Sequence, residues 1–170
     1  QYLEWNEKKE QVLRHQGKKY QVSPAFLLWD NEYYYLVAWD EEAGDVRHYR
    51  VDKIMGAQEF SVARSREALS IEKQKANYAK KRFSMFAGTA EIVTLRAPKH
   101  MAGVMFDRFG TEVFMRSEDD AILVRTEVEV SPQFFGWITG LGAGVEIVRP
   151  ASVRQAYEKH LKQIMAQYEC

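Results

Sequence analysis

Arginine and histidine alternate along one predicted strand, and together they have the residue types of an anion-binding site. The strand reads Val-Arg-His-Tyr-Arg-Val and closes at Val51. Because successive side chains of a strand point to opposite faces, His48 and Arg50 share one face, about 7 Å apart, and Arg47 and Tyr49 share the other with Val51. We expect Tyr49 and Val51 to point inward. The spacing therefore predicts that His48 and Arg50 stand together on the outward face.

The chemistry expected of this outward face is recognition of phosphate. The planar guanidinium of Arg50 offers a fork of donors, and the imidazole of His48 adds a donor that titrates near neutral pH. Three consecutive tyrosines, Tyr33–Tyr35, lie in the preceding strand and can stack on bases. An ordinary polar strand face explains the same spacing equally well. The hypothesis needs Arg50 to face a solvent-accessible hollow. It fails, and only a scaffold remains, if an internal ion pair with a carboxylate locks the side chain and leaves no basic hollow around it.

Motifs of catalysis and of cofactor binding are missing from the sequence. It has no nucleophile elbow, no zinc-protease motif and no Walker A motif. The four histidines include no pair three or four residues apart, the spacing that brings two imidazoles to one metal. The glycine-rich run 140–144 follows a predicted helix and precedes a strand, so we interpret it as a helix stop rather than a phosphate loop. We expect a protein that is not an enzyme and that uses no cofactor and no metal.

Composition indicates a folded chain without a strong charge of its own. Of the 170 residues, 46% are hydrophobic and 13% are aromatic, which excludes an intrinsically disordered chain. Lys and Arg total 24 and Asp and Glu total 24, so any basic site must be local. The single cysteine, Cys170, permits no disulfide framework, and no run of 18 apolar residues suggests a membrane span. We expect a cytoplasmic protein, and the missing start methionine suggests a fragment of a longer one.

The elements that position the predicted site are short strands in residues 1–62. Tyr-, Val- and Trp-rich segments are separated by turn signals such as Gln16-Gly17-Lys18 and Asn31-Glu32, a pattern typical of a small barrel or sandwich. Residues 63–87 carry a net charge of +5 and read as a linker with some helix. This linker is either a solvated connector or a basic rail for phosphates.

Residues 88–170 alternate between strand and helix patterns in the order β-α-β-β-α-β, followed by one more helix. This order is the split βαβ, ferredoxin-like pattern. Ser131-Pro132 starts the second helix, which contains Phe134, Phe135 and Trp137. We expect these aromatics in the core, and the alternative is that they form an interface between subunits. The fold class predicted for the whole chain is α+β.

Three segments in order along the chain resemble the WYL domain family of bacterial transcription regulators. They are Val22-Ser23-Pro24, then Tyr34-Tyr35-Leu36-Val37, and then the segment from Arg47 to Ile54, which resembles the family pattern R-x-F-R-L-D-R-I. Tyr34 replaces the Trp of the W-Y-L tripeptide, and Lys53 replaces an Arg. The second half resembles the C-terminal extension of such proteins, called WCX, through Asp107-Arg108-Phe109-Gly110 and Val145-Glu146-Ile147-Val148-Arg149-Pro150.

The resemblance implies an SH3- or Sm-like barrel at 1–62 and a ferredoxin-like extension at 88–170, on either side of the basic linker at 63–87. It also implies a homodimer, and operator DNA bound through an N-terminal helix-turn-helix that lies outside this chain. Its effector is expected to be single-stranded nucleic acid or a nucleotide. The family's basic pocket falls on Arg50, with further candidates at His48, Ser23, Tyr35, Arg47 and Lys53.

We therefore hypothesise an effector-sensing and dimerisation fragment of a DNA-binding regulator. Two alternatives stay open at this point. The chain is a dimerisation scaffold without a ligand, or it senses a small anionic metabolite instead of a nucleic acid.

Overall fold

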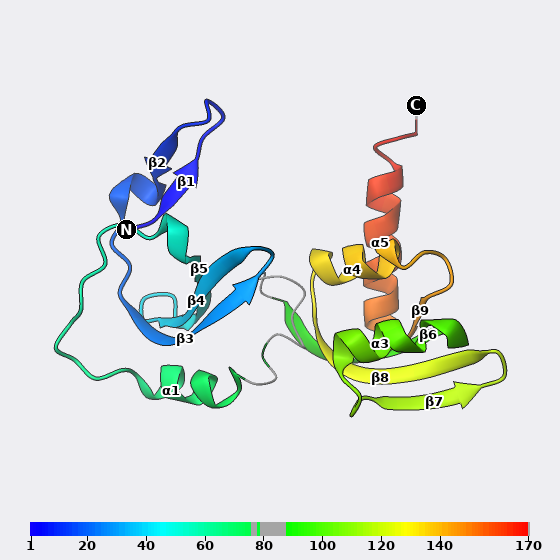
Figure 1. Cartoon of the computed structure of the whole chain (residues 1–170). Coiled ribbons are helices and arrows are strands. Elements are labelled where there is room, and N and C mark those ends of the chain that lie inside the picture. The colour runs from blue at the N-terminus through cyan, green and yellow to red at the C-terminus, as the bar shows by residue number, and fades with distance from the viewer. Residues whose placement is uncertain (76–77, 79–87, 170) are drawn as a thin grey trace. The chain divides into compact units, whose positions relative to one another are not determined.

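The computed structural model describes residues 1–75, 78 and 88–169, and it divides into two compact units, Gln1–Ala76 and Asn77–Cys170 (Figure 1). Both units contain strands and helices, so the predicted α+β class is confirmed. The boundaries predicted at residues 62 and 87 stay a prediction. No helix of the described residues has the length and apolarity that a membrane crossing requires.

The strands of the first unit form two separate antiparallel sheets. A hairpin pairs β1 (Leu3–Trp5) with β2 (Gln11–Leu13). A three-stranded sheet has the order β3-β4-β5, formed by Val22–Asp30, Tyr33–Asp40 and Asp45–Arg50. Short 3-10 turns follow β2 at Arg14–Gly17 (η1) and β5 at Val51–Lys53 (η2). The expected barrel is therefore wrong for the described strands, because β1 and β2 pair with each other and do not close the β3-β4-β5 sheet.

A two-residue turn sets the register of β3 against β4. Asn31 and Glu32 both have positive φ, 46° and 67°, as the tight hairpin turns that match strand twist require. The turn places Asp30 opposite Tyr33 and Leu28 opposite Tyr35. The tight connection predicted at these two residues is confirmed.

Helix α1 (Arg66–Lys73) lies in the segment predicted as a partly helical linker and contacts β3 and β4. The Ser65 hydroxyl caps the helix by accepting from the backbone N–H of Ala68 at 3.2 Å. The Ala68 side chain is fully buried. The packing therefore assigns α1 to the first unit.

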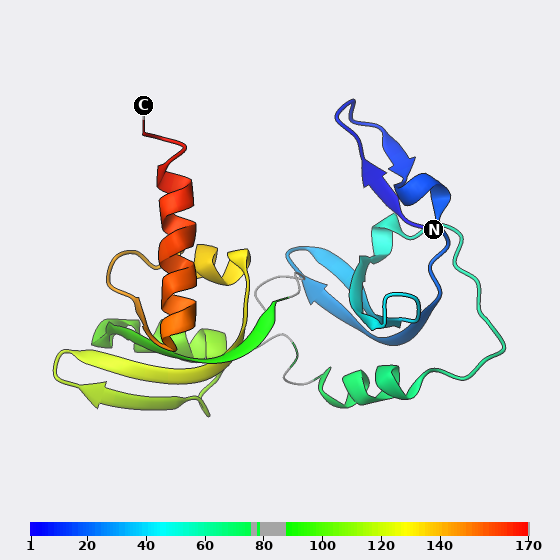
Figure 2. The same ribbon diagram turned by 180° about the vertical axis from the view of Figure 1, so that it is seen from behind.

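The second unit is a four-stranded antiparallel sheet with its helices on one face (Figures 1 and 2). Its strand order is β7-β8-β6-β9. The elements in chain order are β6 (Thr89–Pro98), the 3-10 turn η3 (Lys99–Met101), α3 (Ala102–Phe109), β7 (Phe114–Glu118), β8 (Ala121–Val130), α4 (Pro132–Gly140), β9 (Glu146–Arg149) and α5 (Ala151–Met165).

The two units differ in how much side chain they bury. In the second unit, Phe134 is fully buried and Phe135 nearly so, while Trp137 packs partly buried against the same core. The core interpretation of Phe134 and Phe135 is thus confirmed over the interface alternative. The described residues of the first unit bury a much smaller set, namely Ala25, Phe26, Val37, Ala38, Asp40 and Ala68.

Candidate functional site

The guanidinium of Arg50 lies at the end of β5 and is held on two sides. Its Nε donates to Asp52 Oδ1 at 3.1 Å, and its Nη2 donates to Asp52 Oδ2 at 2.7 Å. Its central carbon lies 3.4 Å from the centroid of the Tyr33 ring, a cation–π contact. The backbone N–H of Arg50 donates to the Tyr2 hydroxyl at 3.0 Å, which fixes the strand end. The charged group is therefore oriented by a carboxylate at its edge and an aromatic ring at its face.

The ion pair lies at the surface. The side chain of Asp52 is 51% exposed and that of Arg50 is 23% exposed. The hydrogen bond from Arg50 holds the pKa of the Asp52 carboxyl below its usual value, and the same bond raises the pKa of Arg50. Both groups are thus ionised at neutral pH. A carboxylate from the same chain therefore occupies the donor fork of Arg50, and this carboxylate is solvent-exposed.

The strand register brings three of the predicted residues to one face of the sheet. Tyr35 lies opposite Arg50 on β4, and Val37 lies opposite His48. Side chains of β5 alternate, so His48 and Arg50 share this face with Tyr35. Burial raises the pKa of the Tyr35 hydroxyl above its usual value, and Tyr35 therefore acts as a neutral hydrogen-bonding group.

Other predicted residues lie elsewhere. Arg47 is exposed on the opposite face of β5, with Tyr49. The inward position predicted for Val51 is wrong: its side chain is 41% exposed, because the strand ends at Arg50 and Val51 begins the turn η2. Lys53 ends the same turn, half-buried and next to Asp52.

Ser23 has a structural role in the first unit. Its hydroxyl donates to Glu41 Oε1 at 2.8 Å and accepts from the backbone N–H of Ser65 at 3.1 Å. Ser23 pairs with Trp39, four residues along β4 from Tyr35. The structure therefore does not bring Ser23 to Arg50 but uses it to join β3 to the start of α1.

The three tyrosines that precede the site divide between the two faces. Tyr33 and Tyr35 lie on the face of Arg50, and Tyr34 lies on the other, where its ring meets Trp29 edge-on at 4.7 Å between centroids. Tyr34 is 55% exposed. It therefore cannot contact a ligand held at Arg50.

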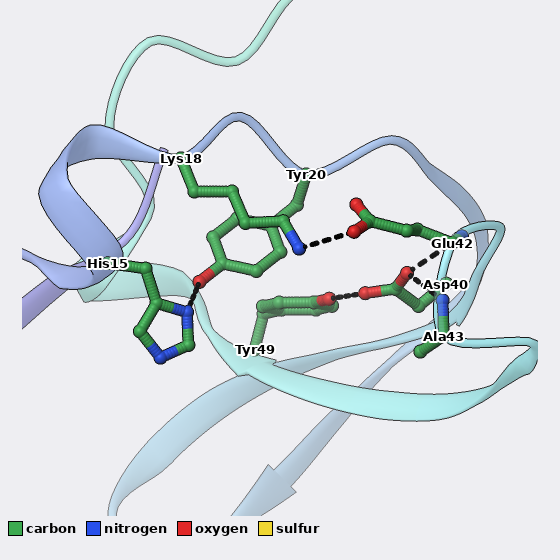
Figure 3. Close-up of polar contacts among 7 residues, drawn as sticks. All are labelled: His15, Lys18, Tyr20, Asp40, Glu42, Ala43 and Tyr49. Atoms are coloured by element: carbon green, nitrogen blue, oxygen red, sulfur yellow. Dashed lines mark hydrogen bonds and ion pairs between the residues drawn. The ribbon is translucent and has the colours of Figure 1, made fainter.

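The face opposite Arg50 carries a polar network that fastens β5 to β4 (Figure 3). The Tyr49 hydroxyl donates to Asp40 Oδ2 at 2.6 Å, and Asp40 Oδ1 accepts from the backbone N–H groups of Glu42 and Ala43. Burial raises the pKa of Tyr49, and the Asp40 hydrogen bond raises it further. Burial also raises the pKa of Asp40, but the bonds from Tyr49, Ala43 and Glu42 outweigh it and leave that pKa below its usual value. This network is satisfied internally and therefore supports the strand rather than forming a binding site.

Residues 15–20 extend the network, as Figure 3 shows. The Tyr20 ring packs 5.7 Å from that of Tyr49, and its hydroxyl lies 3.1 Å from His15 Nδ1. Lys18 Nζ donates to Glu42 Oε1 at 2.8 Å. These contacts cover the Tyr49 face of the sheet around Asp40.

A hollow that the sequence did not predict lies between α1 and the strands β4 and β5. It has a volume of about 350 Å³ and is lined by Trp39, Val46, Arg66, Glu67, Ser70 and Ile71. No pattern in the sequence marks it, because α1 follows β4 by more than 25 residues and only tertiary packing brings the two together. Among the described residues, no group of three or more His, Cys, Asp or Glu side chains could hold a metal ion.

Comparison with protein families assigns both halves of the chain. Residues 5–59 match the WYL domain, and residues 89–165 match the WCX domain. The chain belongs to the family of WYL domain proteins that carry a WCX domain. The resemblance noted in the sequence is thereby confirmed, and the Arg50 face lies within the WYL domain.

Solved structures that this WYL–WCX chain is similar to are much longer. A crystal structure of a CRISPR Cas-related protein has a TM-score of 0.52 and 12% identity, over 89% of this chain and 44% of that one. Proteasome accessory factor B/C (PafBC) of Arthrobacter aurescens has a TM-score of 0.40 and 17% identity, over 99% of this chain and 25% of that one. The chain thus spans less than half the length of each. No curated protein matches the sequence.

Proposed function

We propose that this WYL–WCX chain is the effector-sensing and dimerisation part of a DNA-binding transcription regulator. Its effector is a phosphate-bearing ligand, single-stranded nucleic acid or a nucleotide, bound at Arg50. The observation that carries the proposal is the geometry of the Arg50 fork: an exposed carboxylate occupies it and an aromatic ring backs it. The role is one of binding and not of catalysis.

The proposed contact replaces one anion with another. A phosphate accepts from Nε and Nη2 of Arg50 in place of Asp52, and charge-assisted bonds of this forked kind are among the strongest in proteins. The Tyr33 ring keeps the guanidinium plane in position while the carboxylate leaves. Tyr35 and His48 line the same face, and Lys53 adds a positive charge beside Asp52.

The proposed signal passes to DNA through a dimer. A helix-turn-helix elsewhere in the regulator reads the operator, and the ligand shifts the arrangement of two chains only by its difference in affinity for the two arrangements. Coupling free energies between sites are typically about 1–3 kcal/mol, which one charge-assisted phosphate contact can supply.

The second unit is, in the same proposal, a ferredoxin-like extension. Two observations support this: the element order β-α-β-β-α-β before α5, and the sheet order β7-β8-β6-β9 with every neighbour antiparallel. Such a unit buries one sheet face under helices and leaves the other face free.

The test measures binding of a fluorescein-labelled short oligothymidylate to the 170-residue chain by fluorescence anisotropy. Arg50→Ala should weaken binding at least tenfold, since a hydrogen bond to a charged group contributes roughly 1.5–3 kcal/mol. Arg47→Ala removes the same charge from the opposite face of the same strand and should change the affinity less than about twofold. Equal affinity of Arg50→Ala and the unmodified chain, or no binding by either at low salt, would refute the site.

Salt dependence separates the nucleic acid from a small anion. A strand that neutralises several positive groups loses affinity steeply as salt rises, at about 0.7 of a logarithmic unit per phosphate contact for single strands. A shallow slope, with competition by inorganic phosphate alone, would instead favour a small anionic metabolite.

A further inference from the structure

The hollow between α1 and the β4–β5 pair has the composition of a site for a flat polar ring. Trp39 and Val46, cross-strand neighbours, form one side, and Ile71 adds an apolar side chain from the helix. Arg66, Glu67 and Ser70 bring a cation, an anion and a hydroxyl to the same opening. A volume of about 350 Å³ lies within the range of small-molecule sites.

The helical wall of the hollow is fixed before any ligand arrives. Arg64 Nη1 donates to the backbone oxygen of Pro24 at 3.2 Å, and its Nη2 pairs with Glu72 at 3.0 Å. The Ser65 hydroxyl caps α1, and the backbone N–H of Ser65 donates to the Ser23 hydroxyl on β3. The entry to the helix is thus tied to the sheet at two points, and the hollow is preformed.

The strand register connects this hollow to Arg50. Trp39 pairs with Val46, and Tyr35 pairs with Arg50, so all four side chains point to the same face of the sheet. Val46 and Arg50 are four residues apart, which is about 13 Å along the strand. A ligand that holds a phosphate at Arg50 and extends along β5 therefore reaches the hollow without crossing to another face.

We propose that the hollow is a nucleobase subsite for the ligand whose phosphate Arg50 holds, a deduction that rests on the proposed function. The base stacks on the Trp39 ring between Val46 and Ile71. Glu67 and Ser70 accept from the amino or imino N–H groups at the edge of the base, and Arg66 binds the adjacent phosphate. The occupant is a base because an aromatic face, two acceptors and a cation together match an aromatic ring that carries N–H donors and a neighbouring phosphate.

The test compares two ligands with variants that alter only the opening of the hollow. Ser70→Leu fills it and Arg66→Gln removes its cation, and both residues are exposed, so neither change touches the core. The probes are a labelled oligothymidylate and an abasic strand of the same length. Lys73→Gln, at the far end of α1, is the matched control for the loss of a positive charge.

Loss of one stacked base should weaken binding of the oligothymidylate about tenfold in Ser70→Leu. The abasic strand should bind the unmodified chain as weakly as oligothymidylate binds Ser70→Leu, and Ser70→Leu should not weaken it further. Arg66→Gln should weaken both strands, whereas Lys73→Gln should leave both within about twofold.

Two failures are distinguishable. If Ser70→Leu and Arg66→Gln bind like the unmodified chain while Arg50→Ala loses affinity, the base subsite is wrong and the phosphate site stands. If Arg50→Ala also binds like the unmodified chain, or if the unmodified chain binds neither strand, the proposed function fails and the subsite fails with it.

Discussion

Asp52 and Arg50 are two residues apart in the chain, and the carboxylate of one meets the guanidinium of the other through two hydrogen bonds of 2.7 and 3.1 Å. The geometry is the one that a phosphate adopts on an arginine fork. Because the pair is exposed, it contributes little to the stability of the fold, about 0–1 kcal/mol. In the proposed site, Asp52 competes with the anionic ligand for the same two donors.

Asp52→Asn should therefore strengthen binding of a phosphorylated single strand, by about three- to tenfold, because a neutral amide holds the guanidinium less strongly than a carboxylate. Anisotropy titration at fixed salt measures the change. Asp45→Asn removes one negative charge from the other end of β5 and serves as the control. An unchanged or weaker affinity in Asp52→Asn would show that Asp52 orients Arg50 for the ligand instead of competing with it.

Removal of the ring behind Arg50 should weaken binding moderately. Tyr33→Ala should reduce affinity about two- to fivefold, the size of an exposed cation–π contact, whereas Tyr33→Phe keeps the ring and should bind nearly as the unmodified chain does. Tyr34→Ala, on the opposite sheet face, is the comparison variant and should have no effect. The prediction fails if Tyr34→Ala and Tyr33→Ala weaken binding equally.

The Tyr49–Asp40 bond should support stability and not affinity. Tyr49→Phe leaves the buried Asp40 carboxylate without its closest donor and should lower the free energy of unfolding of the first unit by about 1–3 kcal/mol. Chemical denaturation followed by tryptophan fluorescence measures it. Affinity for the single strand, extrapolated to the folded population, should stay unchanged.

The contribution of the Tyr49–Asp40 hydrogen bond to stability should depend on pH in the acid range. The pKa of Asp40 is lowered in the folded protein, so its contribution to stability is present above the ordinary carboxyl pKa of 3.8 and is lost as pH falls through the lower folded value. The unmodified chain should therefore lose more stability than Tyr49→Phe as pH falls below about 4. Parallel losses in the two proteins would assign the acid sensitivity to other carboxylates.

Phe134→Ala should destabilise the second unit by about 3–5 kcal/mol, because a fully buried ring leaves a cavity. Phe114→Ala removes the same ring from a site that is 64% exposed and should change stability by less than about 0.5 kcal/mol. Calorimetry of both variants gives the comparison. A large effect at Phe114 with a small one at Phe134 would reverse the assignment of core and surface.

Local patterns predicted the strands of the site well. Alternation along β5 placed His48 and Arg50 on one face, and the register against β4 agrees. The outward position predicted for that face is wrong, because Val37 opposite His48 is fully buried and α1 packs over Trp39 and Val46 on the same face. Alternation failed at Val51, because strand geometry ends at Arg50 and a 3-10 turn follows. The carboxylate of Asp52, two residues after Arg50, was the available signal for the ion pair, because residues this close in the chain can pair across a turn.

Tertiary pairing was beyond the sequence. Short strands with turn signals suggested closure into a barrel, but strand patterns do not say which edges pair, and β1 and β2 pair with each other. The sequence predicted that the helical part of the basic segment is a connector. The contact of Ala68 with the sheet comes from tertiary packing, which the sequence pattern does not show. The hollow at Trp39 and Arg66 has the same origin and could not be predicted for that reason.

The few buried side chains of the first unit make its folding sensitive to occupancy. Because the described residues of the first unit bury so little apolar surface, its free energy of unfolding is small. The second unit has a larger buried core. Any molecule that binds only the native form adds RT ln(1 + [L]/Kd) to the free energy of unfolding, about 2.7 kcal/mol at a hundredfold excess over Kd. Saturation with ligand would then raise the melting temperature of the N-terminal half and leave that of the C-terminal half unchanged. Thermal denaturation would therefore show which half binds the effector.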